Sequence, residues 1–178
     1  MVTAGLATPR QFYWVLERPA PLAGMAYPRS SPWSSLASAG FRSVACLSDA
    51  AVRYDPTPLQ VLRAAGLEDL HGGKAPEEPV REASALRDVV AAVVSDLLRG
   101  NGVVVHCVGG TGRTGTVIAC TLRALGLPVH AVLDYMGELN VARRDRPDWT
   151  GWPESEWQLQ QVMEWSDEGA TCADDRRR

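Results

Sequence analysis

The sequence predicts an α/β sandwich in which helices flank a central twisted, mostly parallel sheet. Residues 103–105 are three consecutive valines, a run that is typical of a central parallel strand buried on both faces. Before it, apolar residues recur at three- and four-residue steps from Leu86 to Leu98, which predicts a long amphipathic helix ended by Gly100. After it, an apolar stretch at 115–125 predicts another helix, so helices alternate with the strands.

The N-terminal third of the chain predicts more strands than helices. Residues 12–16 are rich in aromatic and β-branched residues and predict a strand, with 22–26 as its antiparallel partner. Residues 28–39 are rich in Pro, Ser and Ala, which favours a loop with a short helix. The apolar run 43–47 predicts a buried strand, and residues 54–66 predict a helix that a glycine ends.

The C-terminal third predicts two further helices, over residues 131–140 and 153–165, separated by a charged, aromatic loop. The chain length of 178 residues suits one domain. We therefore expect a single domain over residues 1–165 and a disordered tail over residues 166–178.

Composition narrows the classes of partner. The net charge of −3 disfavours nucleic-acid polymers and anionic membranes, and no apolar run has the length of a membrane span. The chain start lacks a basic-then-apolar signal pattern, so we expect a cytoplasmic protein. The four cysteines have neither close pairing nor metal-ligand spacing, which favours neither a disulfide framework nor a metal site.

The segment from Val105 to Gly115 carries the chemistry. A strand ends at Cys107, a glycine-rich loop follows, Arg113 stands six positions on, and a helix begins. A phosphate group needs many donors in a small cup, and glycines let backbone N–H groups turn inward. The N-terminus of the following helix adds its partial positive charge. The residues expected to bind phosphate are Val108, Gly109, Gly110, Thr111, Gly112 and Arg113.

Each side chain of this segment has an expected role. The Arg113 guanidinium can hold two phosphate oxygens at once. The same donors favour the thiolate form of Cys107, which can attack phosphorus and form a cysteinyl-phosphate. The Thr114 hydroxyl can donate to the sulfur when that intermediate breaks down, and His106 is expected to order the loop by hydrogen bonding.

Three other interpretations fit part of this segment. Residues 110–115 match the dinucleotide fingerprint G-x-G-x-x-G, with Asp134 about 20 residues on, where a ribose-binding acid belongs. Against it, residues 126–134 predict a loop and helix in place of a second strand. A Walker-type loop needs Lys where Arg113 stands. A structural turn with a buried cysteine gives no reason to combine a cysteine, glycines and an arginine.

With these motifs the sequence resembles the dual-specificity branch of the protein-tyrosine-phosphatase superfamily, and is most similar to its small atypical members. The resemblance covers roughly residues 11–165, from the opening strands to the closing loop and helix. It implies the phosphatase-type sandwich, a two-step mechanism through a cysteinyl-phosphate, and neither a metal nor a cofactor. By the same resemblance, Gln158 falls where some relatives keep a glutamine that positions water.

The family uses an aspartate general acid on a loop before the cysteine. In this sequence Glu77 takes the expected setting, after one proline and before another and 30 residues before the nucleophile. Asp69 and His71 are alternatives, as is an acid elsewhere such as Asp49. Glu77 can also be an ordinary acidic residue in the first turn of the next helix.

Three functions follow from this pattern. The first is a phosphatase that acts on phosphoprotein at Tyr, Ser or Thr. The second is the same chemistry on a small phosphorylated metabolite, such as a nucleotide, sugar or inositol phosphate. The third is a phosphate-binding module with little turnover. The expected partner is in each case a phosphorylated molecule, and the sequence does not indicate the oligomeric state.

Overall fold

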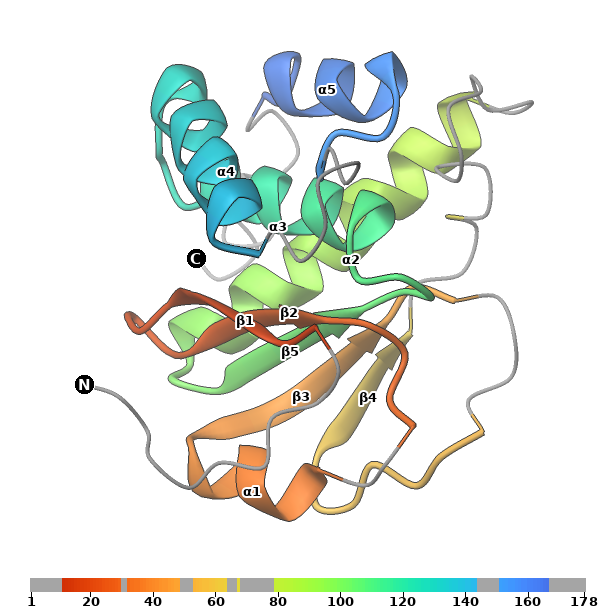
Figure 1. Ribbon diagram of the computed structural model, residues 1–178, viewed down its shortest axis with the longest axis vertical. Helices are drawn as coiled ribbons and strands as arrows, with labels where there is room; N and C mark the ends of the chain where they lie inside the picture. Colours follow the sequence, from red (N-terminus) through yellow and green to blue (C-terminus); the bar gives the residue numbers. More distant parts are fainter. Residues whose placement is uncertain are drawn as a thin grey trace, which may run out of the picture.

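The computed structural model describes residues 11–29, 32–48, 53–63, 67, 79–143 and 151–166, and shows one five-stranded sheet flanked by helices (Figure 1). The strands are β1 (Tyr13–Leu16), β2 (Leu22–Met25), β3 (Phe41–Cys46), β4 (Gln60–Arg63) and β5 (Gly102–His106). The helices are α1 (Trp33–Ser38), α2 (Pro79–Leu98), α3 (Gly112–Ala124), α4 (Val129–Arg143) and α5 (Glu156–Met163). The predicted α/β class is confirmed.

The sheet has the strand order β1-β2-β5-β3-β4, with β5 at its centre. The strand β1 pairs antiparallel with β2, and the other neighbours pair in parallel. The carboxyl ends of β2, β5 and β3 therefore lie side by side at one edge of the sheet. In α/β sheets this edge is where ligands bind.

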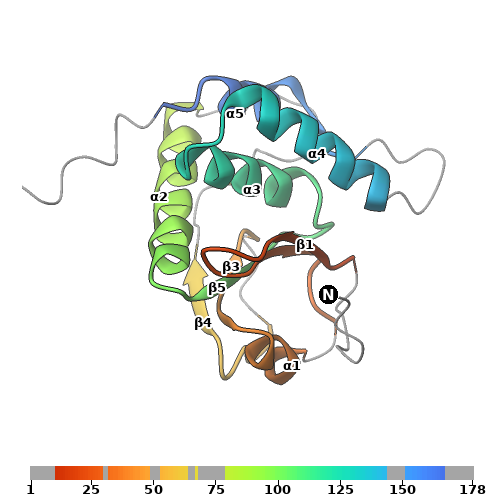
Figure 2. The same cartoon turned by 90° about the vertical axis from the view of Figure 1, so that its left-hand side faces the viewer.

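Helices α2 to α5 cover one face of the sheet and α1 covers the other, as both ribbon views show (Figures 1 and 2). Val103 and Val105 belong to the core on the side of α2 to α5, whereas Val104 belongs to the smaller core beneath α1. The valine run is thus wholly apolar because both faces of β5 are covered.

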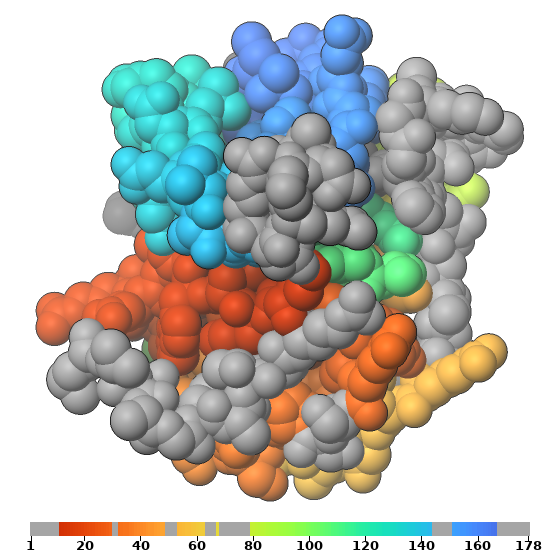
Figure 3. All heavy atoms as spheres, viewed as in Figure 1, coloured from red at the N-terminus to blue at the C-terminus, as the bar shows by residue number. Residues whose placement is uncertain are grey.

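On the larger face the helices form two levels. Helix α3 lies between the sheet and the pair α4 and α5, and it also contacts α2 (Figure 2). In the space-filling view, α4 and α5 are both at the surface, and α4 lies next to β1 (Figure 3). The helix that follows the glycine-rich loop is therefore the innermost one, and residues 112–122 are buried.

The helix predicted over residues 54–66 is wrong. Residues 60–63 form the strand β4, paired in parallel with β3, and residues 53–59 are irregular. Pro58 would be the fifth residue of that helix, where its missing N–H removes an i→i−4 hydrogen bond, and pairing with β3 satisfies the backbone that follows. Val61 packs on the smaller core and Leu62 on the larger, which is the alternation of a strand.

Other boundaries shift by a few residues. Helix α3 begins at Gly112, inside the predicted loop, and α4 extends beyond the predicted 131–140 at both ends. The last helix begins at Glu156 and not at 153, because Ser155 is the N-cap and accepts a hydrogen bond from the Gln158 N–H. None of the helices in the described ranges is long and apolar enough to cross a membrane.

Candidate active site

The segment that links β5 to α3 is held from both neighbouring strands. The Tyr27 N–H, just after β2, donates to the Val108 carbonyl at 3.1 Å. On the other side the Leu47 N–H, just after β3, donates to the His106 carbonyl at 2.9 Å. The loop is therefore hydrogen-bonded to the chain just after β2 and just after β3, as expected for a binding site at this edge of the sheet.

Cys107 lies at the base of this loop with only 4% of its surface exposed. The Gly110 N–H donates to its sulfur at 3.2 Å. The N-terminus of α3, which begins five residues after the cysteine, adds the positive end of the helix dipole. The Cys107 sulfur therefore faces a backbone N–H donor and the positive end of a helix.

The three glycines of the loop have different reasons to be glycine. Gly110 has a φ of +76°, and a Cβ there would lie 2.6 Å from the carbonyl oxygen of Met25. A Cβ on Gly112 would collide with the Glu154 carboxylate and lie 2.7 Å from the Gln158 amide nitrogen. A Cβ on Gly109 would meet nothing within 4 Å.

Arg113 and Thr114 follow on the first turn of α3. The Arg113 guanidinium is 6% exposed and donates from Nη1 to the Leu47 carbonyl at 3.1 Å, which fixes it beside the loop. The Thr114 Oγ1 is buried and finds no hydrogen-bond partner among the described residues. A buried hydroxyl in this state has a donor available for the neighbouring sulfur or for a bound anion.

His106 turns inward, as the sequence predicts, and links the loop to an aromatic cluster. Its Nδ1 lies 3.2 Å from the Cys107 carbonyl, and its Nε2 contacts the Tyr54 hydroxyl. Burial lowers the pKa of His106 to about 4, so the ring is neutral at pH 7. Because a carbonyl only accepts, Nδ1 carries the proton and Nε2 accepts from Tyr54. Trp33 on α1 stacks on Tyr54 with 4.9 Å between the ring centroids, and so helps to fix Tyr54 against His106.

Two further side chains hold the loop and were not assigned this role from the sequence. Tyr13 and Arg143 both donate to the Gly110 carbonyl, from β1 and from the end of α4. The sequence predicted Tyr13 only as part of the strand 12–16, and Arg143 only as part of the charged loop between the last two helices. No local pattern predicts the contact, since 97 residues separate Tyr13 from Gly110.

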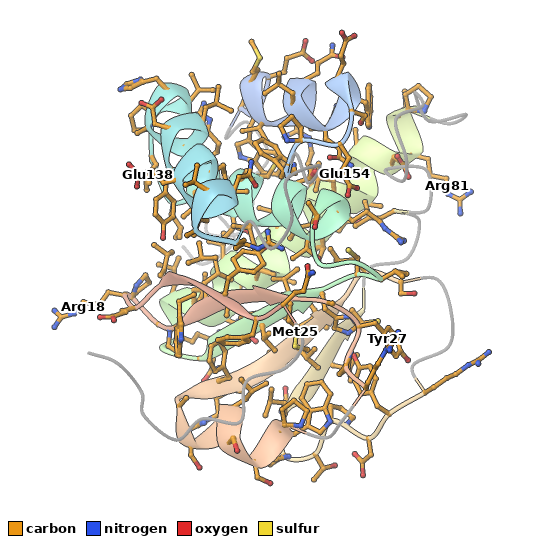
Figure 4. All side chains as sticks on the ribbon, viewed as in Figure 1. Arg18, Met25, Tyr27, Arg81, Glu138 and Glu154 are labelled. Carbon is orange, nitrogen blue, oxygen red and sulfur yellow. The ribbon has the colours of Figure 1, made fainter. Side chains whose placement is uncertain are left out.

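One carboxylate of the described residues lies against the loop, and it is not one of the candidates from the sequence. Glu77, Asp69, His71 and Asp49 lie outside the described residues. In the described part of the chain, the carboxylate that lies against the loop is Glu154, which is placed among α3 and α5, whereas Tyr27 lies on the side of α1 (Figure 4). Sequence reasoning missed Glu154.

Gln158 is fully buried between α5 and the start of α3. Its Oε1 accepts a hydrogen bond from the Glu154 N–H at 2.8 Å, and its Nε2 faces Gly112. Trp152 packs on Gly115 and donates from Nε1 to the Thr116 hydroxyl at 3.0 Å, so it fixes the segment before α5 on α3. The described residues contain no cluster of metal-ligating side chains.

A cysteine beneath a glycine loop, with an arginine on the first turn of the next helix, defines a cysteine-dependent phosphatase. Residues 9–155 match the family described as "Swiss Army Knife protein, DSP-PTPase phosphatase domain". The chain belongs to this family of dual-specificity-type phosphatases. No curated protein matches its sequence.

Solved structures of phosphatases share the fold. The core catalytic domain of the PP-IP phosphatase Siw14 from S. cerevisiae is 15% identical, with 92% of this chain and 90% of that chain covered and a TM-score of 0.60. The kinase associated phosphatase KAP is 15% identical, with 94% and 99% covered and a TM-score of 0.60. PTPMT1, solved in complex with PI(5)P, is 16% identical, with 81% and 88% covered and a TM-score of 0.58.

Proposed function

We propose that this phosphatase hydrolyses phosphate monoesters of phosphoprotein through a cysteinyl-phosphate on Cys107. The observation that carries the proposal is the contact between the Gly110 N–H and the Cys107 sulfur, 3.2 Å long, at the N-terminus of α3. A thiolate held there faces the anion-binding end of a helix and the Arg113 guanidinium together.

In the first step the Cys107 sulfur attacks phosphorus and forms an S–P bond while the bond from phosphorus to the ester oxygen breaks. The leaving oxygen takes a proton from a general acid, for which Glu77 is our first candidate and Asp69 and His71 are alternatives. Arg113 holds two of the remaining oxygens, and the loop N–H groups hold the charge that develops on them.

In the second step water attacks the same phosphorus, the S–P bond breaks, and the acid, now a base, accepts the proton of the water. The sulfur leaves as a thiolate. The buried Thr114 hydroxyl, without a partner among the described residues, can donate to it. Gln158, fully buried and facing Gly112, is our candidate for orienting the attacking water.

The character of the loop supports a substrate that carries a single phosphate. Residues 108–112 contain no basic side chain, so Arg113 is the only cation within the loop segment 107–113. At its rim Val108 is 58% exposed, and its carbonyl accepts a hydrogen bond from the backbone of Tyr27, whose side chain is half-buried. An apolar and aromatic rim suits the aryl carrier of phosphotyrosine better than a carrier with several phosphates.

The alternative is the same chemistry on a small phosphorylated metabolite. It is motivated by two structures that share the fold, a PP-IP phosphatase and PTPMT1 in complex with PI(5)P. Fold similarity does not fix the substrate. A phosphate-binding module with little turnover is disfavoured, because the cysteine, the arginine and the anion-binding loop are all in place.

A substrate screen tests both activity and substrate class. Wild-type protein and Cys107→Ser are incubated with a panel of phosphopeptides and phosphorylated nucleotides, sugars and inositols, and released phosphate is measured. We expect the wild type to release phosphate fastest from phosphotyrosine peptides, and Cys107→Ser to release none while still binding vanadate. Turnover by Cys107→Ser would contradict the covalent mechanism, and a preference for a metabolite would replace the protein substrate with the alternative.

A further inference from the structure

The carbonyl of Gly110 accepts hydrogen bonds from two side chains outside the loop. The Tyr13 hydroxyl donates to it at 3.3 Å and the Arg143 Nη2 donates at 2.9 Å. The same two side chains contact each other, since the Arg143 Cζ lies 3.7 Å from the centre of the Tyr13 ring. A strand and a helix end from distant parts of the chain therefore meet on one carbonyl of the phosphate loop.

Packing leaves the Tyr13 ring little freedom. The side chain is 6% exposed, and it fills the space in which a Cβ of Gly24 on the paired strand would stand. Burial raises the pKa of Tyr13, a shift that the charge of Arg143 partly opposes. The phenol therefore stays protonated, and it is a permanent donor to the Gly110 carbonyl.

Fixing this carbonyl also orients the loop donors. The Gly110 carbonyl and the Thr111 N–H belong to one trans peptide unit, so they point in opposite directions. With the carbonyl held by Tyr13 and Arg143, the Thr111 N–H is directed away from that pair. A cation bound to the carbonyl also polarises the same amide and makes its N–H a stronger donor. The neighbouring Gly110 N–H is already on the Cys107 sulfur.

We propose that Tyr13 and Arg143 are positioning residues that hold the phosphate loop in its anion-binding conformation and support the thiolate of Cys107. The proposal rests on the proposed role of Cys107 as the nucleophile. The competing role for Arg143 is a basic residue in the last turn of α4, which stabilises the helix through its dipole. A helix-stabilising role changes the free energy of unfolding and leaves the chemistry of the loop unaltered.

The test uses full-length Tyr13→Phe, Arg143→Ala and Arg143→Lys. Tyr13→Phe removes one hydroxyl and keeps the packed ring, so it tests the loop contact even if Arg143→Ala fails to fold. Arg99→Ala is the control, because Arg99 directly follows α2 and its side chain, 69% exposed, pairs with Asp96 of that helix at 3.6 Å. Four quantities are measured. They are kcat/KM on an aryl phosphate, the dissociation constant of vanadate, the free energy of unfolding in urea, and the pH at which half of Cys107 reacts with iodoacetamide, identified on its peptide by mass spectrometry.

We expect Arg143→Ala to lower kcat/KM about 10- to 100-fold, the range that one hydrogen bond to a charged group represents. Vanadate binding should weaken in parallel, and the pH midpoint of alkylation should move upward. Arg143→Lys keeps the charge and should recover part of each effect. Tyr13→Phe should move the midpoint in the same direction by less, and Arg99→Ala should match the wild type.

If Arg143→Ala and Tyr13→Phe fold and keep the wild-type alkylation midpoint and vanadate affinity, the positioning role is wrong. If only their free energy of unfolding falls, the helix-stabilising role replaces it. Failure of the proposed function has a different signature, because turnover by Cys107→Ser on the same aryl phosphate would show that another nucleophile acts.

Discussion

At the scale of the residue, the three glycines before Arg113 show how a motif combines positions with different causes. Sequence reasoning treated them alike, as sources of conformational freedom. The structure requires glycine at 110 for its positive φ and for its close approach to the Met25 carbonyl, whereas at 109 it leaves open space. A local pattern cannot separate these positions, because the atoms that crowd Gly110 belong to β2.

We predict that Gly110→Ala lowers the free energy of unfolding by about 2–4 kcal/mol, from left-handed strain and overlap with β2 together. It should also reduce kcat/KM by about 100-fold or more, because the N–H on the Cys107 sulfur is displaced. Gly109→Ala is the control and should change the free energy of unfolding by less than about 0.5 kcal/mol. Urea denaturation and phosphate release measure both quantities. Equal stability of the two variants would contradict this account of the loop.

His106 gives the protein a dependence on pH that does not come from catalysis. Its pKa is lowered to about 4 in the folded protein, against 6.5 for an ordinary histidine. Between these two pH values the unfolded chain binds a proton that the folded protein does not, so the free energy of unfolding falls as the pH decreases. We predict a loss of about 2–3 kcal/mol from this residue between pH 7 and pH 4.5.

The measurement is urea denaturation of wild type and His106→Asn at both pH values, because the titration of carboxylates is common to both proteins. His106→Asn should lose less stability on acidification than the wild type. His130→Asn is the control, since His130 is exposed on α4, and it should behave like the wild type. If His106→Asn and wild type respond equally to pH, the histidine is not buried in neutral form.

The sequence proposes Glu77 as the general acid. Glu77 lies outside the described residues, so kinetics supplies the test of its role. If Glu77 is the acid, Glu77→Gln should lower kcat on an alkyl phosphate by about 10²- to 10⁴-fold. The loss on an activated aryl phosphate should be far smaller, because that leaving group departs without a proton. Parallel losses on both substrates would exclude Glu77 and direct the same test to Asp69 and His71.

At the scale of the element, the periodicity of apolar residues predicted the elements that are buried on one face, such as α2, and those that are buried on both faces, such as β5. Helix α2 and strand β5 have the predicted character because their apolar residues face cores that the rest of the chain supplies. The strand β4 was not predicted, because its conformation depends on a partner strand. Only four residues long at the edge of the sheet, it is defined by its pairing with β3, which a local pattern does not contain.

Two adjacent leucines test which face of α2 is directed toward the core. Leu97 is fully buried between α2 and the sheet, whereas Leu98 is 66% exposed. We predict that Leu97→Ala lowers the free energy of unfolding by about 2–5 kcal/mol, and that Leu98→Ala changes it by less than about 0.5 kcal/mol. Urea denaturation of the two variants measures the difference. A larger loss for Leu98→Ala would mean that the helix presents another face to the core.

At the scale of the whole molecule, the site exists because three strand ends meet beside one helix. The sequence predicted Cys107, the loop and Arg113 because they lie within one continuous segment. It did not predict that Leu47 would hold Arg113, or that Tyr13 and Arg143 would hold Gly110, because these contacts join segments that are distant in the sequence. The reactive residues were therefore predictable from one local segment. The contacts that hold them in place are tertiary contacts, which the local sequence does not contain.

The covalent bond that Cys107 is proposed to form to phosphorus during turnover can be detected directly. Wild-type protein mixed with an aryl phosphate is quenched in acid within milliseconds, digested, and analysed by tandem mass spectrometry. We expect a phosphoryl group on the sulfur of Cys107 that accumulates before steady state and is absent in Cys107→Ser. Full turnover with an unmodified Cys107, or a phosphoryl group on another side chain, would contradict it.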